Sequence, residues 1–160
     1  ENFLKGQKTN KVFSLDKTVI NASQFAIEAD MRDYLVKNWS KTEFYEKYNI
    51  CTDENDEIIG KEYPIGDKKN WKIDILAISK DEKEYLVIEL KKGREGDKVV
   101  GQILRYMGAV TKNLLEGEQT VKGAIIAFEE DEEIKSALVM YNKIDYYRYE
   151  LDFKLFKIDE

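Results

Sequence analysis

Two acids and a lysine interrupt an otherwise apolar stretch of the sequence, residues 71–91, whose pattern predicts two strands joined by a polar turn. Asp74 lies in the first strand, and Glu89 and Lys91 lie in the second. Neighbouring carboxylates suit a divalent cation such as Mg²⁺, which takes oxygen ligands and often binds substrate phosphates as well. A lysine beside the ion could orient or activate a water molecule and stabilise charge developing on a phosphoryl group. The three residues are therefore candidates for metal-dependent hydrolysis of a phosphate ester.

The pairing register of the expected hairpin decides whether these side chains meet. If Ser79 pairs with Glu84, Asp74 lies directly opposite Glu89, with Cβ atoms roughly 4.5–5.5 Å apart, and Lys91 points to the same face. A slip of one residue would move Asp74 to the other face. Like charges placed opposite each other destabilise a sheet, so a bound cation is the natural compensation. The alternative is a solvated hairpin with a surface Glu–Lys pair.

The composition excludes several classes of protein. The 160 residues suffice for one domain with a buried core. Without histidine, neither a Ser-His-Asp triad nor a histidine zinc site can form, and the lone Cys51 excludes an internal disulfide and a cysteine zinc finger. The net charge of −6 disfavours non-specific nucleic-acid binding, although an acidic body can carry a local basic patch. No apolar run of transmembrane length and no signal-peptide pattern is found, so we expect a cytoplasmic protein.

The elements around the hairpin predict a single α/β or α+β domain. Residues 49–57 are polar and turn-like. The expected helices cover 21–38, 41–48, 97–113 and 129–142, and the expected strands cover 58–65, 71–79, 84–91, 121–128 and 147–155. The buried stripe expected for the helix 97–113 comprises Val100, Ile103, Leu104, Met107 and Thr111. The hairpin face opposite the two acids is expected to be wholly apolar, with Ile73, Ile75, Ala77, Leu86, Ile88 and Leu90.

The ordered set Asp74, Glu89 and Lys91 resembles the signature of the PD-(D/E)XK nuclease superfamily. Downstream, Gln102 and Tyr106 are similar to the Gln-x-x-x-Tyr helix motif of its RecB-like branch. The longer strings around these five residues are similar to the C-terminal nuclease domain of NucS-like endonucleases.

This resemblance implies a restriction-endonuclease-like α/β fold, with a mixed central β-sheet flanked by α-helices, over residues 21–160. Residues 1–20 would then be an N-terminal extension. The implied activity is Mg²⁺- or Mn²⁺-dependent endonucleolytic hydrolysis of DNA phosphodiesters, which leaves a 5′-phosphate. NucS-like proteins carry a further N-terminal domain that binds DNA and dimerises, so a fragment of a larger protein and a homodimer are both compatible with the resemblance.

The resemblance also assigns roles around the metal. The implied ligands are Asp74, Glu89, the backbone carbonyl of Leu90 and Glu28. Lys91 would orient or help deprotonate the attacking water. For Glu28, which lies on the first expected helix, the alternative is a surface ion pair with Arg32, four residues further on.

The same resemblance indicates which residues contact DNA. Gln102 would position the substrate strand or the catalytic water. The implied substrate-binding residues are Lys92, Arg94, Arg105 and Tyr106. The alternatives are a solvated basic loop and a polar helix face with one packed tyrosine. The acid run 129–133 would repel a phosphate backbone, so we expect DNA to approach elsewhere, and Trp71 could stack on a base or pack in the core.

Three hypotheses remain open from the sequence. The leading one is a metal-dependent DNA endonuclease domain without membrane association. The second is a catalytically silent nuclease-fold module that binds nucleic acid or a protein partner, in keeping with the net charge of −6. The third is a structural or interaction domain whose charged hairpin is merely solvated.

Overall fold

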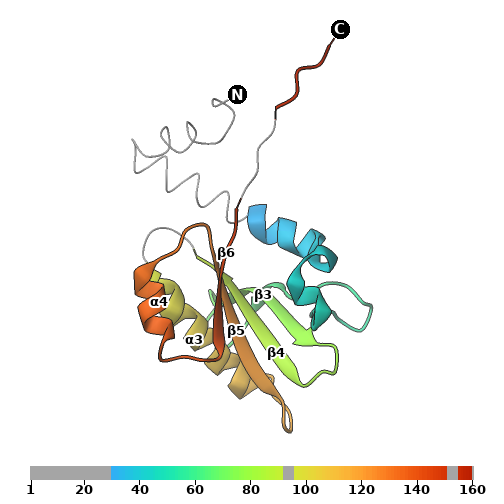
Figure 1. Ribbon diagram of the computed structural model, residues 1–160. Helices are drawn as coiled ribbons and strands as arrows, with labels where there is room; N and C mark the ends of the chain where they lie inside the picture. Colours follow the sequence, from blue (N-terminus) through green and yellow to red (C-terminus); the bar gives the residue numbers. More distant parts are fainter. Residues whose placement is uncertain (1–29, 92–95, 151–154, 160) are drawn as a thin grey trace.

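A mixed β-sheet forms the centre of the protein in the computed structural model, which describes residues 30–91, 96–150 and 155–159 (Figure 1). Its strands are β1 (Tyr48–Ile50), β2 (Lys61–Pro64), β3 (Lys72–Ser79), β4 (Glu84–Leu90), β5 (Thr120–Ala127) and β6 (Ile144–Arg148). The order across the sheet is β1-β3-β4-β5-β6, and β2 also pairs with β3. The antiparallel β3–β4 hairpin therefore lies at the middle of the sheet, where both of its faces can be covered.

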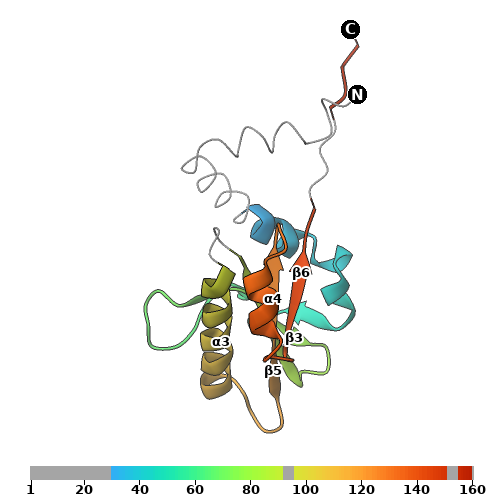
Figure 2. The same ribbon diagram turned by 60° about the vertical axis from the view of Figure 1, so that its left-hand side comes forward.

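Helices flank the two faces of this sheet. Parallel pairing of β4 with β5, and of β5 with β6, requires crossover connections, which α3 (Gly96–Asn113) and α4 (Glu132–Leu138) supply. These two helices lie on one face, and helix 30–37 with the 3₁₀ helices η2 (Trp39–Lys41) and η3 (Glu43–Glu46) lies on the other (Figures 1 and 2). This is the expected α/β architecture. In the described part of the chain, the helices are too short or too polar to cross a bilayer.

Alternation along the strands produces one apolar core on each face. Leu76, Val87 and Ile125 pack beneath α3 and α4, whereas Ile75 and Ile88 pack beneath the N-terminal helices. The residues expected on the apolar face of the hairpin do pack together in the core beneath the N-terminal helices, except Ile73, which packs on the α3 side. Regular alternation fails there because Asp74, the next residue, bonds to β4 through its side chain as well as its backbone.

The packing of α3 follows helical periodicity, with two corrections. Its buried residues are Val99, Val100, Ile103, Tyr106, Met107, Ala109 and Val110. Thr111, expected in the stripe, is exposed, because Val110 occupies that turn of the buried face. Tyr106, expected on the polar face, is buried at 5% exposure. The face in contact with the sheet is thus wider than the stripe that the sequence suggested.

Five elements differ from expectation in their extent. Strand β2, expected over 58–65, covers only Lys61–Pro64. Residues 41–48 form 3₁₀ turns rather than one helix, and β1, expected as the end of that helix and a turn, pairs with β3. Helix α4 is shorter than 129–142 because Asp131 caps its N-terminus. Strand β6 begins earlier than expected and ends where its partner β5 ends, and residues 155–159 form no strand. Residues 21–29 and 151–154, within the expected first helix and last strand, lie outside the described residues.

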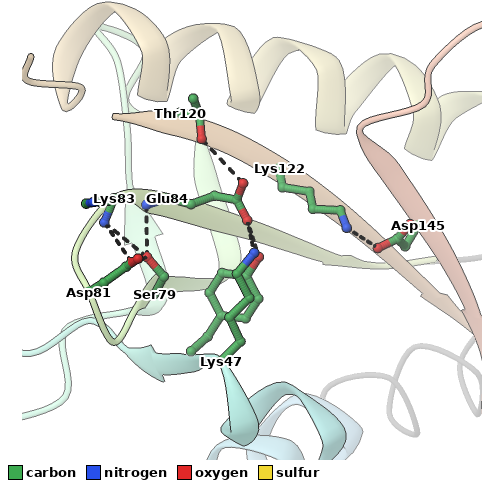
Figure 3. A network of polar contacts seen from close by, with 9 residues as sticks. Lys47, Ser79, Asp81, Lys83, Glu84, Thr120, Lys122 and Asp145 are labelled. Atoms are coloured by element: carbon green, nitrogen blue, oxygen red, sulfur yellow. Dashed lines mark hydrogen bonds and ion pairs between the residues drawn. The ribbon is translucent and has the colours of Figure 1, made fainter. Parts of the chain in front are cut away.

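A polar network at the turn end of the hairpin holds β3 and β4 in register (Figure 3). Ser79 Oγ accepts hydrogen bonds from the N–H groups of Lys83, at 3.1 Å, and Glu84, at 2.9 Å. Glu84 in turn accepts bonds from Lys47 Nζ, at 2.9 Å, and Thr120 Oγ1, at 3.3 Å, and from the Tyr48 hydroxyl. One carboxylate thereby joins β1, β4 and β5. Register at this end determines which residues face each other at the far end.

Candidate active site

Asp74 and Glu89 lie opposite each other across the hairpin. The observed pairs Leu76–Val87 and Ile75–Ile88 have the predicted register, and continuing this register by one residue places Asp74 opposite Glu89. The Asp74 N–H donates to Glu89 Oε1 at 3.0 Å, and the Leu90 N–H donates to Asp74 Oδ2 at 2.9 Å. The two acids are only 3% and 1% exposed, so the interpretation of a solvated hairpin is wrong for this end.

A guanidinium from helix 30–37 faces the first of these acids. Arg32 Nη1 lies 3.7 Å from Asp74 Oδ1 and 3.3 Å from Glu62 Oε1 on β2. The Arg32 side chain is 14% exposed, so the alternative that placed it in a surface ion pair is wrong about its location. Glu28, the acid expected from the same helix, lies outside the described residues. Arg32 is a positive group at the site that sequence reasoning treated only as a partner for Glu28.

Lys91 follows directly after β4. Its side chain lies on the α4 side of the site, opposite helix 30–37, which carries Arg32. Its backbone N–H donates to the Ile126 carbonyl at 2.8 Å, which continues the pairing with β5. Its ammonium lies 3.0 Å from Asp131 Oδ2, and the two side chains are 10% and 16% exposed. One member of the acid run 129–133 therefore binds the candidate catalytic lysine, and the expectation that DNA approaches away from this run stays a prediction.

Asp131 is held on several sides. Its Oδ1 accepts the N–H groups of Glu133 and Ile134, at 2.8 and 3.3 Å, and its own N–H donates to Tyr146 Oη at 3.0 Å. Burial raises the pKa of this carboxyl, but the hydrogen bond from Lys91 and the α4 N–H groups lower it, and the net pKa is lowered. A Cβ on Gly96 would lie only 2.4 Å from Asp131 Oδ2, so a larger residue at the start of α3 would have to displace the Asp131 carboxylate. Asp131 is thus an ionised group at the meeting point of β4, α3 and α4.

Sequence reasoning missed Asp131 as a site residue, although a signal was present. An aspartate followed by two glutamates and an isoleucine is typical of a helix N-cap. The pattern indicates where α4 starts, but the distance of forty residues to Lys91 hides the contact.

Gln102 and Tyr106 interact on α3 one turn apart, as their spacing suggested. Gln102 Nε2 donates to Tyr106 Oη at 3.0 Å. The Tyr106 ring is buried and makes an edge contact with Trp71, with ring centroids 6.0 Å apart. The tyrosine is therefore packed in the core while its hydroxyl meets a half-buried amide. Arg105, beside it, is exposed.

The remaining expected site residues divide into two groups. Leu90 is 2% exposed and ends β4 next to Glu89. Lys92 and Arg94 lie outside the described residues.

The donor chemistry of the site fits a hard divalent cation. Asp74 and Glu89 present carboxylate oxygens side by side in a nearly dry environment, and Mg²⁺ is commonly bound by one or two carboxylates. Over the described ranges, no three acidic or cysteine side chains converge on one point. The described residues therefore offer two carboxylates, and a third would have to come from elsewhere in the chain.

The order of the elements and the place of the two acids define the chain as a restriction-endonuclease-like α/β fold. A central hairpin bearing the acids is followed by a helix that crosses to a parallel strand. The same fold occurs in a solved repair endonuclease from Pyrococcus abyssi, which is 21% identical over 77% of this chain, with a TM-score of 0.56. It also occurs in EndoMS, solved in complex with double-stranded DNA, which is 20% identical over 80% of this chain, with a TM-score of 0.56.

These comparisons confirm the resemblance at the level of the fold. The aligned part spans 46% of each of the two solved chains, so this chain corresponds to about half of their length. No protein-family model and no curated protein sequence matches the chain.

Proposed function

We propose that the chain is a metal-dependent DNA endonuclease domain that hydrolyses phosphodiester bonds with Mg²⁺ or Mn²⁺. The observation that carries the proposal is the pair Asp74 and Glu89, which are buried and face each other on a central hairpin. Two adjoining buried carboxylates are costly unless positive charge compensates them. The fold shared with two solved endonucleases supports DNA as the substrate class.

Asp74 and Glu89 would hold the ion, together with the backbone carbonyl of Leu90 and the carboxylate of Glu28. When bound, the ion supplies Lewis-acid polarisation of a phosphate oxygen and makes a water molecule more acidic. Asp74 Oδ2 and Glu89 Oε1 each accept a backbone N–H, which orients both carboxylates before any ligand arrives. A carboxylate oxygen has a second lone pair for a further bond, so these hydrogen bonds are compatible with ligation.

Lys91 would donate a hydrogen bond to the attacking water and offset negative charge that develops on the phosphoryl group. The contact with Asp131 at 3.0 Å holds the Lys91 side chain in place at the end of β4. This fixed position supports an orienting and charge-stabilising role for Lys91. As water adds to phosphorus, the bond to the 3′ oxygen breaks; the water gives up one proton to solvent and the leaving 3′ oxygen takes one up, which leaves a 5′-phosphate and a 3′-hydroxyl.

Gln102 and Tyr106 would position the substrate strand. Their mutual hydrogen bond holds the amide of Gln102 on a rigid helix, since the Tyr106 ring is packed in the core. Arg105, Lys92 and Arg94 would contact phosphates on either side of the reacting one.

A cleavage assay tests the proposal. Single-stranded, duplex and branched DNA are incubated with Mn²⁺ and the wild-type protein, and the Lys91→Ala variant is compared with Lys112→Ala, an exposed lysine in the last turn of α3. Loss of the lysine at the site should lower the rate about 10²-fold or more, whereas Lys112→Ala should leave it unchanged. Cleavage that persists in Lys91→Ala would assign the activity to another source. DNA binding without cleavage by the wild type would instead favour the silent module.

A further inference from the structure

The loop between β2 and β3, residues 65–71, has a defined conformation. Its two ends are tied together, since the Ile65 N–H donates to the Trp71 carbonyl at 3.0 Å. Within it, the Trp71 N–H donates to the Lys68 carbonyl at 3.1 Å, and Gly66 adopts a φ of 75°, which favours glycine. Ile65 is buried at 5% exposure. The loop is therefore anchored at its base, and Lys68 projects from an ordered tip.

This loop packs against α3 beside the candidate active site. The Trp71 ring contacts the edge of Tyr106, whose hydroxyl bonds to Gln102. A Cβ on Gly66 would lie 3.3 Å from the Trp71 ring and 4.0 Å from Ala109 Cβ, which shows how closely the loop follows the helix. In Figure 2 the loop extends sideways from the sheet next to α3.

Lys72 connects the loop to the two acids. It is the first residue of β3, and it is exposed although Asp74, two positions further along, is buried. Residues two apart on a strand are roughly 7 Å apart along it. Lys72 therefore lies at the exposed end of β3, two residues from the buried Asp74.

Exposed basic side chains gather beside the candidate active site. The side chains of Lys68, Lys69, Lys72 and Arg105 are exposed and make no ion pair or hydrogen bond within the described ranges. Lys83, Lys112 and Lys143, at the other end of the sheet, are also exposed and form no ion pair among the described residues. The first group differs from them by its position, because Lys72 is two residues from Asp74 and Arg105 adjoins Tyr106.

We propose that Lys68, Lys69 and Lys72, here called the basic loop, bind the phosphate backbone of duplex DNA and lead it across α3 to Asp74 and Glu89. The inference rests on the proposed function and adds the path of the substrate. Exposed ammonium groups on an anchored loop suit phosphate binding, because the loop backbone loses little conformational freedom on association and the ammonium groups release counterions from the DNA. The path runs over the loop and the exposed side of α3.

Binding is measured by fluorescence anisotropy with a labelled DNA duplex and without activating metal, over a series of salt concentrations. The test variant is Lys68→Ala/Lys69→Ala/Lys72→Ala. The matched control is Lys83→Ala/Lys112→Ala/Lys143→Ala, which removes the same charge from exposed residues at the other end of the sheet, at the hairpin turn, the end of α3 and the start of β6.

The basic-loop variant should bind at least tenfold more weakly than the control, and its salt dependence should fall by about 0.9 in the logarithmic slope for each lost phosphate contact. Equal weakening in both variants would mean that only net charge matters, and unchanged binding in the basic-loop variant would place DNA elsewhere; either overturns the inference. Cleavage by the wild type with normal binding by the variant would reject this surface alone. A wild type that neither binds nor cleaves duplex DNA would reject the proposed function as well.

Discussion

Lys91 Nζ lies 3.0 Å from Asp131 Oδ2, and this contact joins the end of the central hairpin to the N-terminus of α4. The same carboxylate uses its other oxygen to cap the helix. The position of the candidate catalytic lysine is thus coupled to the start of a helix forty residues further along the chain.

Replacing Asp131 by asparagine separates its two roles. Asparagine caps helices about as well as aspartate, so α4 should remain in place, but the charge that holds Lys91 is lost. Cleavage should fall about 10- to 100-fold with little change in KM or in the thermal midpoint, as for other residues that orient a reacting group. Rates, KM and the thermal midpoint measured on the purified variant check this.

Two comparisons control for indirect effects of Asp131→Asn. Glu132→Gln changes the neighbouring acid, which forms an ion pair with Lys135 rather than Lys91, and should retain activity. In a Lys91→Ala background, Asp131→Asn should have no additional effect, because the two residues act as a unit. Independent, multiplicative losses would contradict the coupling.

Removing either buried acid should abolish the response of the protein to metal. Mn²⁺ should raise the thermal midpoint of the wild type, since a ligand that binds only the folded state stabilises it. Asp74→Asn and Glu89→Gln should lose this shift while remaining folded, because each substitution keeps the shape of the side chain and removes one of two adjoining like charges. Glu118→Gln, at an exposed acid near the turn end of the hairpin and away from Asp74 and Glu89, serves as the control. A full Mn²⁺ shift in Glu89→Gln would place the ion elsewhere.

Arg32 should compete with a cation for Asp74. Its guanidinium faces Asp74 Oδ1 at 3.7 Å, so a bound divalent ion must share that carboxylate with an existing positive charge. Arg32→Gln is therefore expected to tighten Mn²⁺ binding by on the order of tenfold, as measured by calorimetric titration of the protein without DNA. Weaker binding in Arg32→Gln would indicate that the guanidinium instead supports the site by orienting Asp74.

The Glu84 network should make stability depend on pH. Burial raises the pKa of Glu84, but bonds from Tyr48, Lys47 and Thr120 outweigh it, and the net pKa is lowered from its ordinary 4.5. A carboxyl with a lowered pKa in the folded state contributes stability above its unfolded pKa and loses it as the pH falls through the folded value. Glu84→Gln should lower the free energy of unfolding by about 1 kcal/mol at neutral pH. The expected loss is small because Lys47 is exposed and solvent screens its ion pair with Glu84.

Urea unfolding of wild type and Glu84→Gln at several pH values measures this effect. The difference in unfolding free energy should shrink as the pH falls below 4.5. A difference that stays constant down to strongly acidic pH would assign the cost to packing rather than to the charge.

The central hairpin could be predicted because its information is local. A four-residue polar turn with Ser79 and Glu84 at its ends fixes the pairing, and the register then places Asp74 opposite Glu89. The contacts that complete the site are long-range. Arg32 arrives from a helix on the other face of the sheet, and Asp131 arrives through a parallel crossover, so no spacing in the sequence reveals either.

Tyr106 and β1 also depend on contacts that the local pattern does not contain. The sequence left open whether this tyrosine is packed, and Trp71 from the β2–β3 loop covers it. Strand β1 has only three residues, too few to show a recognisable alternation of apolar and polar side chains. It forms a strand because the edge of β3 is available to pair with it.

The most direct test of the account is a crystal structure of the full chain grown with Mn²⁺, in which anomalous scattering locates the ion. The account predicts a single strong peak bound by carboxylate oxygens of both Asp74 and Glu89. A peak held by other residues, or no peak at this hairpin with Mn²⁺ in excess, would contradict the proposal that the two buried acids form a metal site.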